Sequence, residues 1–214
     1  MVADALSHLR SQLPAGVQLV AVSKFHPVER LMEAYAAGQR IFAESRPQEL
    51  AAKVPLMPED VQWHFIGHLQ TNKLKLVLPY VTLVQSVDSL HLLEAISAWG
   101  EANGRVVDVL LELHLGAEET KQGFSAEDIC SLCSRVHDFP GVRFRGLMGM
   151  ATNTEDEAVI DSDFARIEAL FHQIGPMEAF DQLSIGMSAD WPIAVRHGAT
   201  MVRIGTDIFG PREY

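Results

Sequence analysis

A lysine follows an apolar, β-branched segment near the start of the chain. The segment covers residues 17–23, and Lys24 comes directly after it. If the segment is a strand of a parallel barrel, its carboxyl end lies at the face where barrels carry their active sites. Low-dielectric walls there would lower the pKa of the Lys24 amine and leave more of the neutral form that attacks carbonyl groups. Lys24 is therefore predicted to form a Schiff base, and a solvated lysine at the start of a loop is the alternative.

Two turns near the other end of the chain have residues that could bind an anion. Residues 183–190 pass from a predicted strand through small residues into a helix, where Ser188 is predicted to be the N-cap. The strand predicted at residues 201–204 ends at Gly205 and Thr206. Hydroxyls and backbone N–H groups in such turns hold phosphate, and barrels often bind phosphate in the loops after their last two strands. The two turns together predict a phosphate site, although these residue types also form turns that bind nothing.

Arg203 is predicted to lie on the last strand, with its side chain directed towards the mouth of the barrel. A guanidinium donates hydrogen bonds and accepts none, so Arg203 could contact a bound ligand there as a donor. The alternative is an internal ion pair with a barrel carboxylate such as Glu112. The sequence leaves both interpretations open.

Two further constellations have the spacing of metal or redox motifs. His64 and His68 stand at i and i+4, but Gly67 and the strand-like pattern around them argue against a helical metal pair. His64 is instead predicted to line the end of the barrel or to lie in its core. Cys130 and Cys133 form a C-x-x-C spacing inside an amphipathic helix, where they are predicted to pack as small apolar residues. No metal site is predicted.

Short apolar segments alternate with amphipathic helical segments along the whole chain. This alternation is typical of a parallel sheet, and about eight strand candidates predict a (β/α)8 TIM-like barrel with an extra N-terminal helix at residues 3–13. Pro47 suits the first turn of a helix, and Asp88 and Ser125 suit N-caps. A flavodoxin-like open sheet is the alternative. The predicted strands cover residues 17–23, 40–42, 62–66, 83–86, 107–114, 143–148, 182–185 and 201–204.

The composition is that of an ordinary globular protein and argues against several classes of function. The 214 residues suffice for one buried core, so a single domain covering residues 1–214 is predicted. With 17 Lys and Arg against 28 Asp and Glu, the net charge of -11 disfavours nucleic acid as a partner. The N-terminus lacks the order of a signal peptide, and no apolar run is long enough to cross a bilayer. We expect a cytoplasmic protein that does not bind membranes.

Taken together, these segments resemble the family of pyridoxal phosphate homeostasis proteins, whose barrel is similar to the N-terminal domain of bacterial alanine racemase. The resemblance covers nearly the whole chain. It rests on A-V-S-K at residues 21–24, W-H-F-I-G-H-L-Q-T-N-K at 63–73, R-G-L-M at 145–148, S-I-G-M-S-A-D at 184–190 and V-R-I-G-T-D-I-F-G at 202–210.

The resemblance implies that the chain binds pyridoxal 5′-phosphate (PLP) and that Lys24 carries it as an internal aldimine. By the same resemblance, Arg203 would face the pyridine nitrogen of the cofactor. The phosphate would be held by residues of the two turns described above, namely Ser184, Ser188, Gly205 and Thr206.

One position departs from the pattern of the family. The family usually has F-G-E-N after the second strand, whereas residues 42–45 read F-A-E-S. Ser45 therefore replaces the asparagine that normally contacts the ring, and its shorter side chain would reach the cofactor only through water or a closer backbone. Met148 and His64 are further candidate contacts, since both lie near strand ends at the same face.

The resemblance bears on whether the chain is a carrier or an enzyme. A racemase needs acid–base groups on both faces of its substrate, and alanine racemases take one from a tyrosine of a second domain. The chain ends at Tyr214, soon after the last predicted strand, so no second domain is expected. An arginine at the ring nitrogen would leave that nitrogen unprotonated and make the ring a poor electron sink. We expect storage, protection or delivery of PLP without robust turnover, with PLP-dependent apo-enzymes as candidate recipients.

Two other functions are alternatives to that of a PLP carrier. A small PLP-dependent amino-acid racemase could use Lys24 as one base and Tyr35 or a water as the other. A Schiff-base aldolase acting on a sugar phosphate would also need a barrel lysine and a phosphate site, but no coloured cofactor.

Overall fold

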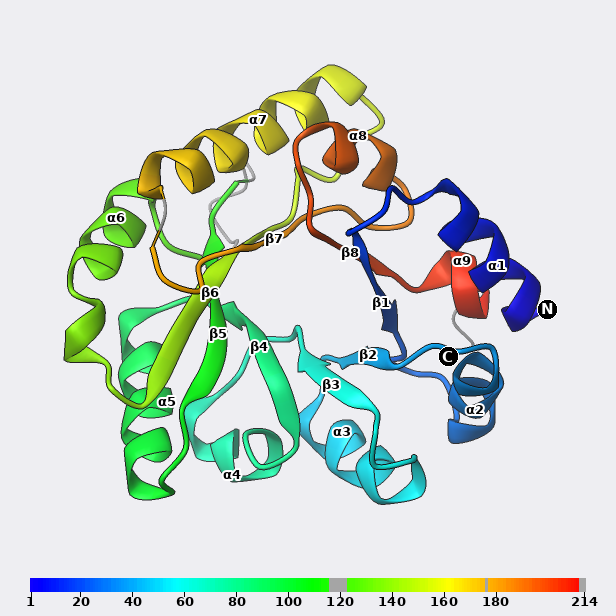
Figure 1. The fold of residues 1–214 in the computed structure, drawn as a ribbon, viewed down its shortest axis with the longest axis horizontal. Helices are drawn as coiled ribbons and strands as arrows, with labels where there is room; N and C mark the ends of the chain where they lie inside the picture. Colours follow the sequence, from blue (N-terminus) through cyan, green and yellow to red (C-terminus); the bar gives the residue numbers. More distant parts are fainter. Residues whose placement is uncertain (116–122, 176, 212–214) are drawn as a thin grey trace.

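Eight parallel strands close into a barrel in the computed structural model of the protein (Figure 1). The structure describes residues 1–115, 123–175 and 177–211. Each strand pairs with the next one along the chain, and β8 closes the barrel against β1. The predicted (β/α)8 architecture is confirmed, and the open flavodoxin-like sheet is wrong.

The strands form from the apolar segments predicted above, and the last of them has the predicted bounds. Successive side chains point alternately into the barrel and outwards beneath the helices. Val20, Ala43, Leu110 and Met201 belong to the group that fills the interior, while a larger apolar cluster packs between strands and helices. The strands are β1 (Gln18–Val22), β2 (Ile41–Glu44), β3 (Gln62–Phe65), β4 (Val81–Val87), β5 (Val107–Leu113), β6 (Val142–Gly149), β7 (Gln182–Ser184) and β8 (Met201–Ile204).

Helices surround the barrel, and the N-terminal helix α1 packs beside α2 and α9 (Figure 1). Within the described ranges, no helix is both long and apolar enough to cross a bilayer. The α-helices are α1 (Val2–Gln12), α2 (Val28–Ala36), α3 (Pro47–Lys53), α4 (Leu74–Val77), α5 (Leu90–Ala102), α6 (Ala126–Ser134), α7 (Glu157–Ile174), α8 (Trp191–Arg196) and α9 (Thr206–Phe209), and the short 3-10 helices are η1 (Val54–Leu56), η2 (Thr71–Lys73) and η3 (Val136–Asp138).

The starts of α3 and α6 follow the capping chemistry of the sequence, whereas the start of α5 does not. Pro47 occupies the first turn of α3, and Ser125 caps α6 through a reciprocal capping box. The predicted cap at Asp88 is wrong, because Ser89 caps α5 with its hydroxyl oxygen. The carboxylate of Asp88 instead lies 2.8 Å from Nδ1 of His68, at the end of the barrel that carries the carboxyl ends of the strands.

Candidate functional site

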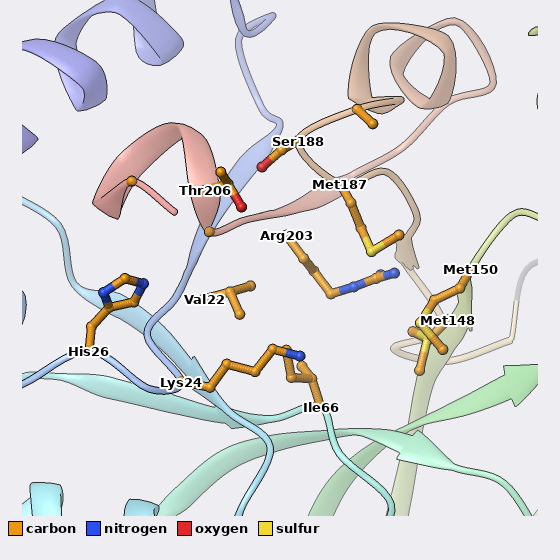
Figure 2. Close-up of a pocket in the computed structure, with 13 residues that line it drawn as sticks. Val22, Lys24, His26, Ile66, Met148, Met150, Met187, Ser188, Arg203 and Thr206 are labelled. Atoms are coloured by element: carbon orange, nitrogen blue, oxygen red, sulfur yellow. The ribbon is translucent and has the colours of Figure 1, made fainter. Parts of the chain in front are cut away.

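A cavity of about 270 Å³ opens at the carboxyl ends of the strands (Figure 2). Its wall combines the start and the end of the chain, because β1 and β8 are neighbours in the closed barrel. Side chains that follow β1, β7 and β8 form its polar part, and methionines near β6 and β7 contribute an apolar part. The predicted active-site face and the observed cavity therefore coincide.

Lys24 extends from the turn after β1 into this cavity (Figure 2). The residue is half-buried, and the fully buried Ser23 precedes it. The following residue, Phe25, has a φ of 69°, a left-handed conformation that residues with a Cβ rarely adopt. The Lys24 amine thus forms part of the wall, as expected of a lysine that reacts with a bound carbonyl.

Ser188 and Thr206 place two hydroxyls on another side of the cavity, and Figure 2 shows their oxygens directed towards each other. Among the described residues, no hydrogen bond occupies either hydroxyl. Gly205 lies close to β1, since a Cβ on it would lie 3.3 Å from the carbonyl oxygen of Val22. Two unoccupied hydroxyls beside a glycine suit an anionic group such as phosphate.

The prediction that Ser188 caps the following helix is wrong. Asp190 is the N-cap of α8, and its carboxylate accepts a hydrogen bond of 2.6 Å from the backbone N–H of Met187. Ser188 lies in the turn before this cap, so its hydroxyl is directed to the cavity. Because α8 and α9 are both short, we expect hydroxyls and loop N–H groups to hold an anion here, and not the N-terminus of a helix.

Arg203 reaches the cavity from β8 through a buried side chain. Its Nη1 donates to the carbonyl oxygen and to Oγ of Ser184, each at 2.7 Å, and Nη2 donates to the carbonyl oxygen of Gly149 at 2.9 Å. Burial lowers the pKa of Arg203 to about 10, so the guanidinium remains a cation at neutral pH. Glu112 favours this cation through its charge, with no hydrogen bond between the two side chains in the part of the chain described.

A chain of hydrogen bonds continues from Arg203 into the interior of the barrel. Ser184 Oγ donates to Gln85 Oε1 at 2.7 Å, and Gln85 Nε2 lies 2.9 Å from His64 Nδ1. An amide nitrogen can only donate, so His64 accepts at Nδ1 and carries its proton on Nε2. Burial lowers the pKa of His64 to about 3, in agreement with a neutral ring. Ser184 and His64 therefore support Arg203 from behind.

Glu112 is a buried carboxyl on β5 whose charge interacts with Arg203. Burial and then the charge of Asp88 raise its pKa to about 7, against opposing effects of Arg203 and His68. Between the ordinary value of 4.5 and about 7, the folded protein keeps a proton on Glu112 that the unfolded chain has released. The free energy of unfolding is expected to fall as the pH rises through this window and to level off above it.

Glu112→Gln is expected to remove this loss of stability. The free energy of unfolding should differ little from wild type at pH 5 and exceed it at pH 8 by on the order of 3 kcal/mol. Urea unfolding of the ligand-free proteins at both pH values measures the difference. Glu94→Gln, at an exposed position of α5, is the control and should show no such pH dependence. An effect of Glu112→Gln that is equal at the two pH values would contradict the raised pKa.

Some of the residues predicted to contact the ligand line the cavity, and others do not. Ser184 and His64 lie behind its wall, and Ser45 does not line it. Ser45 follows β2 directly, and its backbone lies against Gly67, where a Cβ would lie 2.1 Å from the Ser45 carbonyl oxygen. The ligand contacts of all these residues stay predictions. The predicted residues that do line the cavity are Lys24, Met148, Ser188, Arg203, Gly205 and Thr206.

Sequence reasoning missed His26 as a residue of the cavity wall. Its ring lies against Phe209, with 4.9 Å between the ring centroids, so it links the turn after β1 to α9. The available signal was its position two residues after Lys24. Met187, in the segment between β7 and α8, also reaches the same cavity (Figure 2).

Metal and redox chemistry find no support in the described side chains. No group of three or more His, Cys, Asp or Glu among them is arranged to hold a metal ion. Cys130 and Cys133 are free thiols on α6 that pack against the core. Burial and the neighbouring thiol raise the pKa of Cys133 to about 12, so it stays protonated and is a poor nucleophile.

The chain is similar to known proteins over nearly its whole length. The profile of the family "Alanine racemase, N-terminal domain" matches residues 2–213. A pyridoxal phosphate homeostasis protein of Schizosaccharomyces pombe is 38% identical over 98% of this chain and 92% of its own length. The structure of PipY from Synechococcus elongatus PCC7942 without PLP covers 98% of this chain and 100% of PipY, with a TM-score of 0.91 and 38% identity. PipY with PLP bound has a TM-score of 0.88 and 37% identity, with the same coverage.

Proposed function

The chain belongs to the family of pyridoxal phosphate homeostasis proteins, which share the alanine racemase N-terminal domain, and from this premise we propose that it binds PLP in the cavity of Figure 2. Its proposed role is the storage, protection or delivery of PLP in the cytoplasm. The observation that carries the proposal is the convergence of the Lys24 amine with the hydroxyls of Ser188 and Thr206 in one cavity. An aldehyde that also bears a phosphate suits this combination.

The proposed attachment is a Schiff base to Lys24. The neutral amine would attack the aldehyde carbon of PLP, the C=N bond would form, and the aldehyde oxygen would leave as water. The phosphate would lie between Ser188 and Thr206, whose hydroxyls can donate to its oxygens. Gly205 would allow the phosphate to approach the backbone.

Arg203 is proposed to face the pyridine nitrogen of PLP. Because a guanidinium can only donate, this nitrogen would accept a hydrogen bond and stay unprotonated. The ring would then withdraw electrons weakly, which suits a bound cargo better than a catalyst of proton abstraction. The contacts of Ser184 favour a supporting role beneath Arg203 over the phosphate contact that the resemblance implied.

The positions of the described tyrosines also favour a carrier over a racemase. Tyr35 donates to Asp60 at 2.7 Å, and its ring lies under Arg40. Asp60 and Arg40 precede β3 and β2, so the hydroxyl of Tyr35 lies at the end of the barrel opposite the cavity. Tyr80 precedes β4 at that same end, and Tyr214 lies outside the described residues. Neither described tyrosine is placed to act as a second base.

Titration with PLP tests the proposal. The purified protein is expected to gain the visible absorption band of a Schiff base with PLP, and to release PLP to an apo-enzyme whose activity then recovers. Alanine racemisation by the same sample should stay far below the rate of about 1 per second that is typical of enzymes. Pyridoxine 5′-phosphate, which lacks the aldehyde, is the control ligand and should give no band.

The outcomes separate the alternatives. A band accompanied by racemisation at an enzymatic rate would favour the small racemase. No band with PLP, together with a Schiff base trapped on a sugar phosphate, would favour the aldolase.

A further inference from the structure

Three charged residues form an ionic cluster between α3 and the turn that carries Lys24. Glu44 belongs to β2, and Glu49 and Lys53 belong to α3; we call these three residues the α3 cluster. Lys53 Nζ donates to one carboxylate oxygen of Glu44 and to one of Glu49, each at 2.7 Å. Ser23 Oγ also donates to Glu44 at 2.7 Å. The Glu44 side chain is completely buried, and that of Lys53 is 8% exposed. None of the three lines the cavity.

The cluster holds the backbone on both sides of Lys24. Lys53 Nζ donates to the carbonyl oxygen of Ser23 at 2.8 Å, and the backbone N–H of Phe25 donates to Glu49 Oε1 at 2.7 Å. These groups belong to the two peptide units that flank Lys24, so both backbone torsions of the lysine are constrained. The hydrogen bond that the Phe25 N–H donates to Glu49 also holds Phe25 in its left-handed conformation, which is unfavourable for a residue with a Cβ.

The composition of the cluster is hard to explain by stability alone. Burial raises the pKa of Glu44, against the opposing effects of Lys53 and Ser23. The second carboxylate oxygen of Glu44 has no hydrogen-bond partner among the residues that the structure describes. Apolar residues of similar volume often replace buried ion pairs without loss of stability. Polar groups are needed here if their task is to grip a carbonyl oxygen and an N–H of the turn.

We propose that Glu44, Glu49 and Lys53 are positioning residues that set the reach of Lys24 towards the aldehyde of bound PLP. The inference rests on the proposed function and deepens it. The cluster would act through the backbone of the turn and would touch neither the ring nor the phosphate. Its loss should slow formation of the bond to Lys24 while the cavity keeps its affinity for the rest of the ligand.

Glu49 offers the sharpest test, because its side chain is 20% exposed and its loss leaves Lys53 paired with Glu44. Glu49→Leu removes the acceptor for the Phe25 N–H, and Glu49→Gln keeps a carbonyl oxygen there. We expect Glu49→Leu to slow formation of the borohydride-reducible bond at Lys24 by about 10-fold or more, and Glu49→Gln to stay within about 3-fold of wild type. The Kd of pyridoxine 5′-phosphate, which cannot form the bond, should change by less than about 2-fold.

Gln39→Leu is the matched control for a general loss of stability. Gln39 is buried and donates to the carbonyl oxygens of Leu19 and Ile41, each at 2.7 Å, so it joins β1 and β2 at the end away from the cavity. This variant should lower the Tm without slowing bond formation, measured well below the lowest Tm of the set.

Three results would overturn the inference. The first is formation of the bond to Lys24 in Glu49→Leu at the wild-type rate. The second is a loss of affinity of Glu49→Leu for pyridoxine 5′-phosphate that matches its loss of rate. A slow Gln39→Leu would likewise show that any weakening of β1 and β2 has the same effect. If wild-type protein forms no bond at Lys24, the proposed function fails first and this inference fails with it.

Discussion

Replacing Lys24 with alanine is expected to abolish covalent attachment of PLP at the turn after β1. After incubation with PLP and reduction with borohydride, wild-type protein should carry the pyridoxyl group on the peptide that contains Lys24. The Kd for PLP should rise by about 100-fold or more in Lys24→Ala, which corresponds to about 3 kcal/mol of lost binding free energy. Contacts to the phosphate and the ring would remain, so residual binding is expected. Mass spectrometry of the peptides and an absorbance titration measure the two effects.

The fold should survive this substitution. Ser23 and Phe25 hold the turn through their backbone groups, and the side chain of Lys24 lines a cavity instead of filling the core. Lys73→Ala is the matched control, because Lys73 ends η2 and does not line the cavity. Lys73→Ala should keep both the pyridoxyl label on the peptide that contains Lys24 and the wild-type affinity for PLP. Equal affinities of the two variants, or a wild-type label on a different peptide, would rule out Lys24 as the point of attachment.

The fold was predictable because each strand is a short apolar segment bounded by turn residues. In a parallel barrel every strand is buried on both faces, so its sequence signal is strong and local. β8 shows this best, since residues 201–204 are apolar except for Arg203 and end at Gly205. The error at Asp88 has a local cause as well. Asp and Ser are both good N-caps, and the sequence alone does not decide which of two neighbours, Asp88 or Ser89, starts the helix.

The cavity wall was predictable as far as the closed topology determines it. The carboxyl ends of all strands meet at one face, so Lys24 after β1 and Thr206 after β8 had to come close. The depth of a side chain along the barrel axis could not be predicted, because the alternation along a strand shows which side chains point inwards but not how far they lie from the mouth of the barrel. Ser184 and His64 do not line the cavity; Ser184 accepts a hydrogen bond from Arg203, and His64 contacts Gln85.

The α3 cluster could not be predicted from local sequence. Glu44 lies beyond the strand predicted at residues 40–42, although the observed β2 ends at it, and Lys53 is a basic residue in the last turn of α3. Their role depends on how α3 packs over the turn between β1 and α2, which is a tertiary relation.

The double variant Ser188→Ala/Thr206→Val is expected to lose affinity for PLP through the phosphate alone. Each hydroxyl would donate one charge-assisted hydrogen bond to the phosphate, worth about 1.5–3 kcal/mol. The Kd for PLP should therefore rise by on the order of 100-fold or more, while the Kd for pyridoxal, which has the aldehyde and no phosphate, should change little. Inorganic phosphate should compete with PLP for wild-type protein and compete poorly for the variant. Absorbance titrations with both ligands provide the comparison.

The ligand pair distinguishes a phosphate site from a general disturbance of the cavity. A distorted cavity would weaken pyridoxal and PLP by similar factors, because both place the same ring beside Lys24 and Arg203. Ser131→Ala/Thr154→Val removes two hydroxyls that do not line the cavity and should leave both affinities unchanged. Parallel losses for the two ligands would place the phosphate elsewhere, whereas a loss confined to PLP would fix its orientation, with the phosphate between the turns after β7 and β8 and the aldehyde towards Lys24.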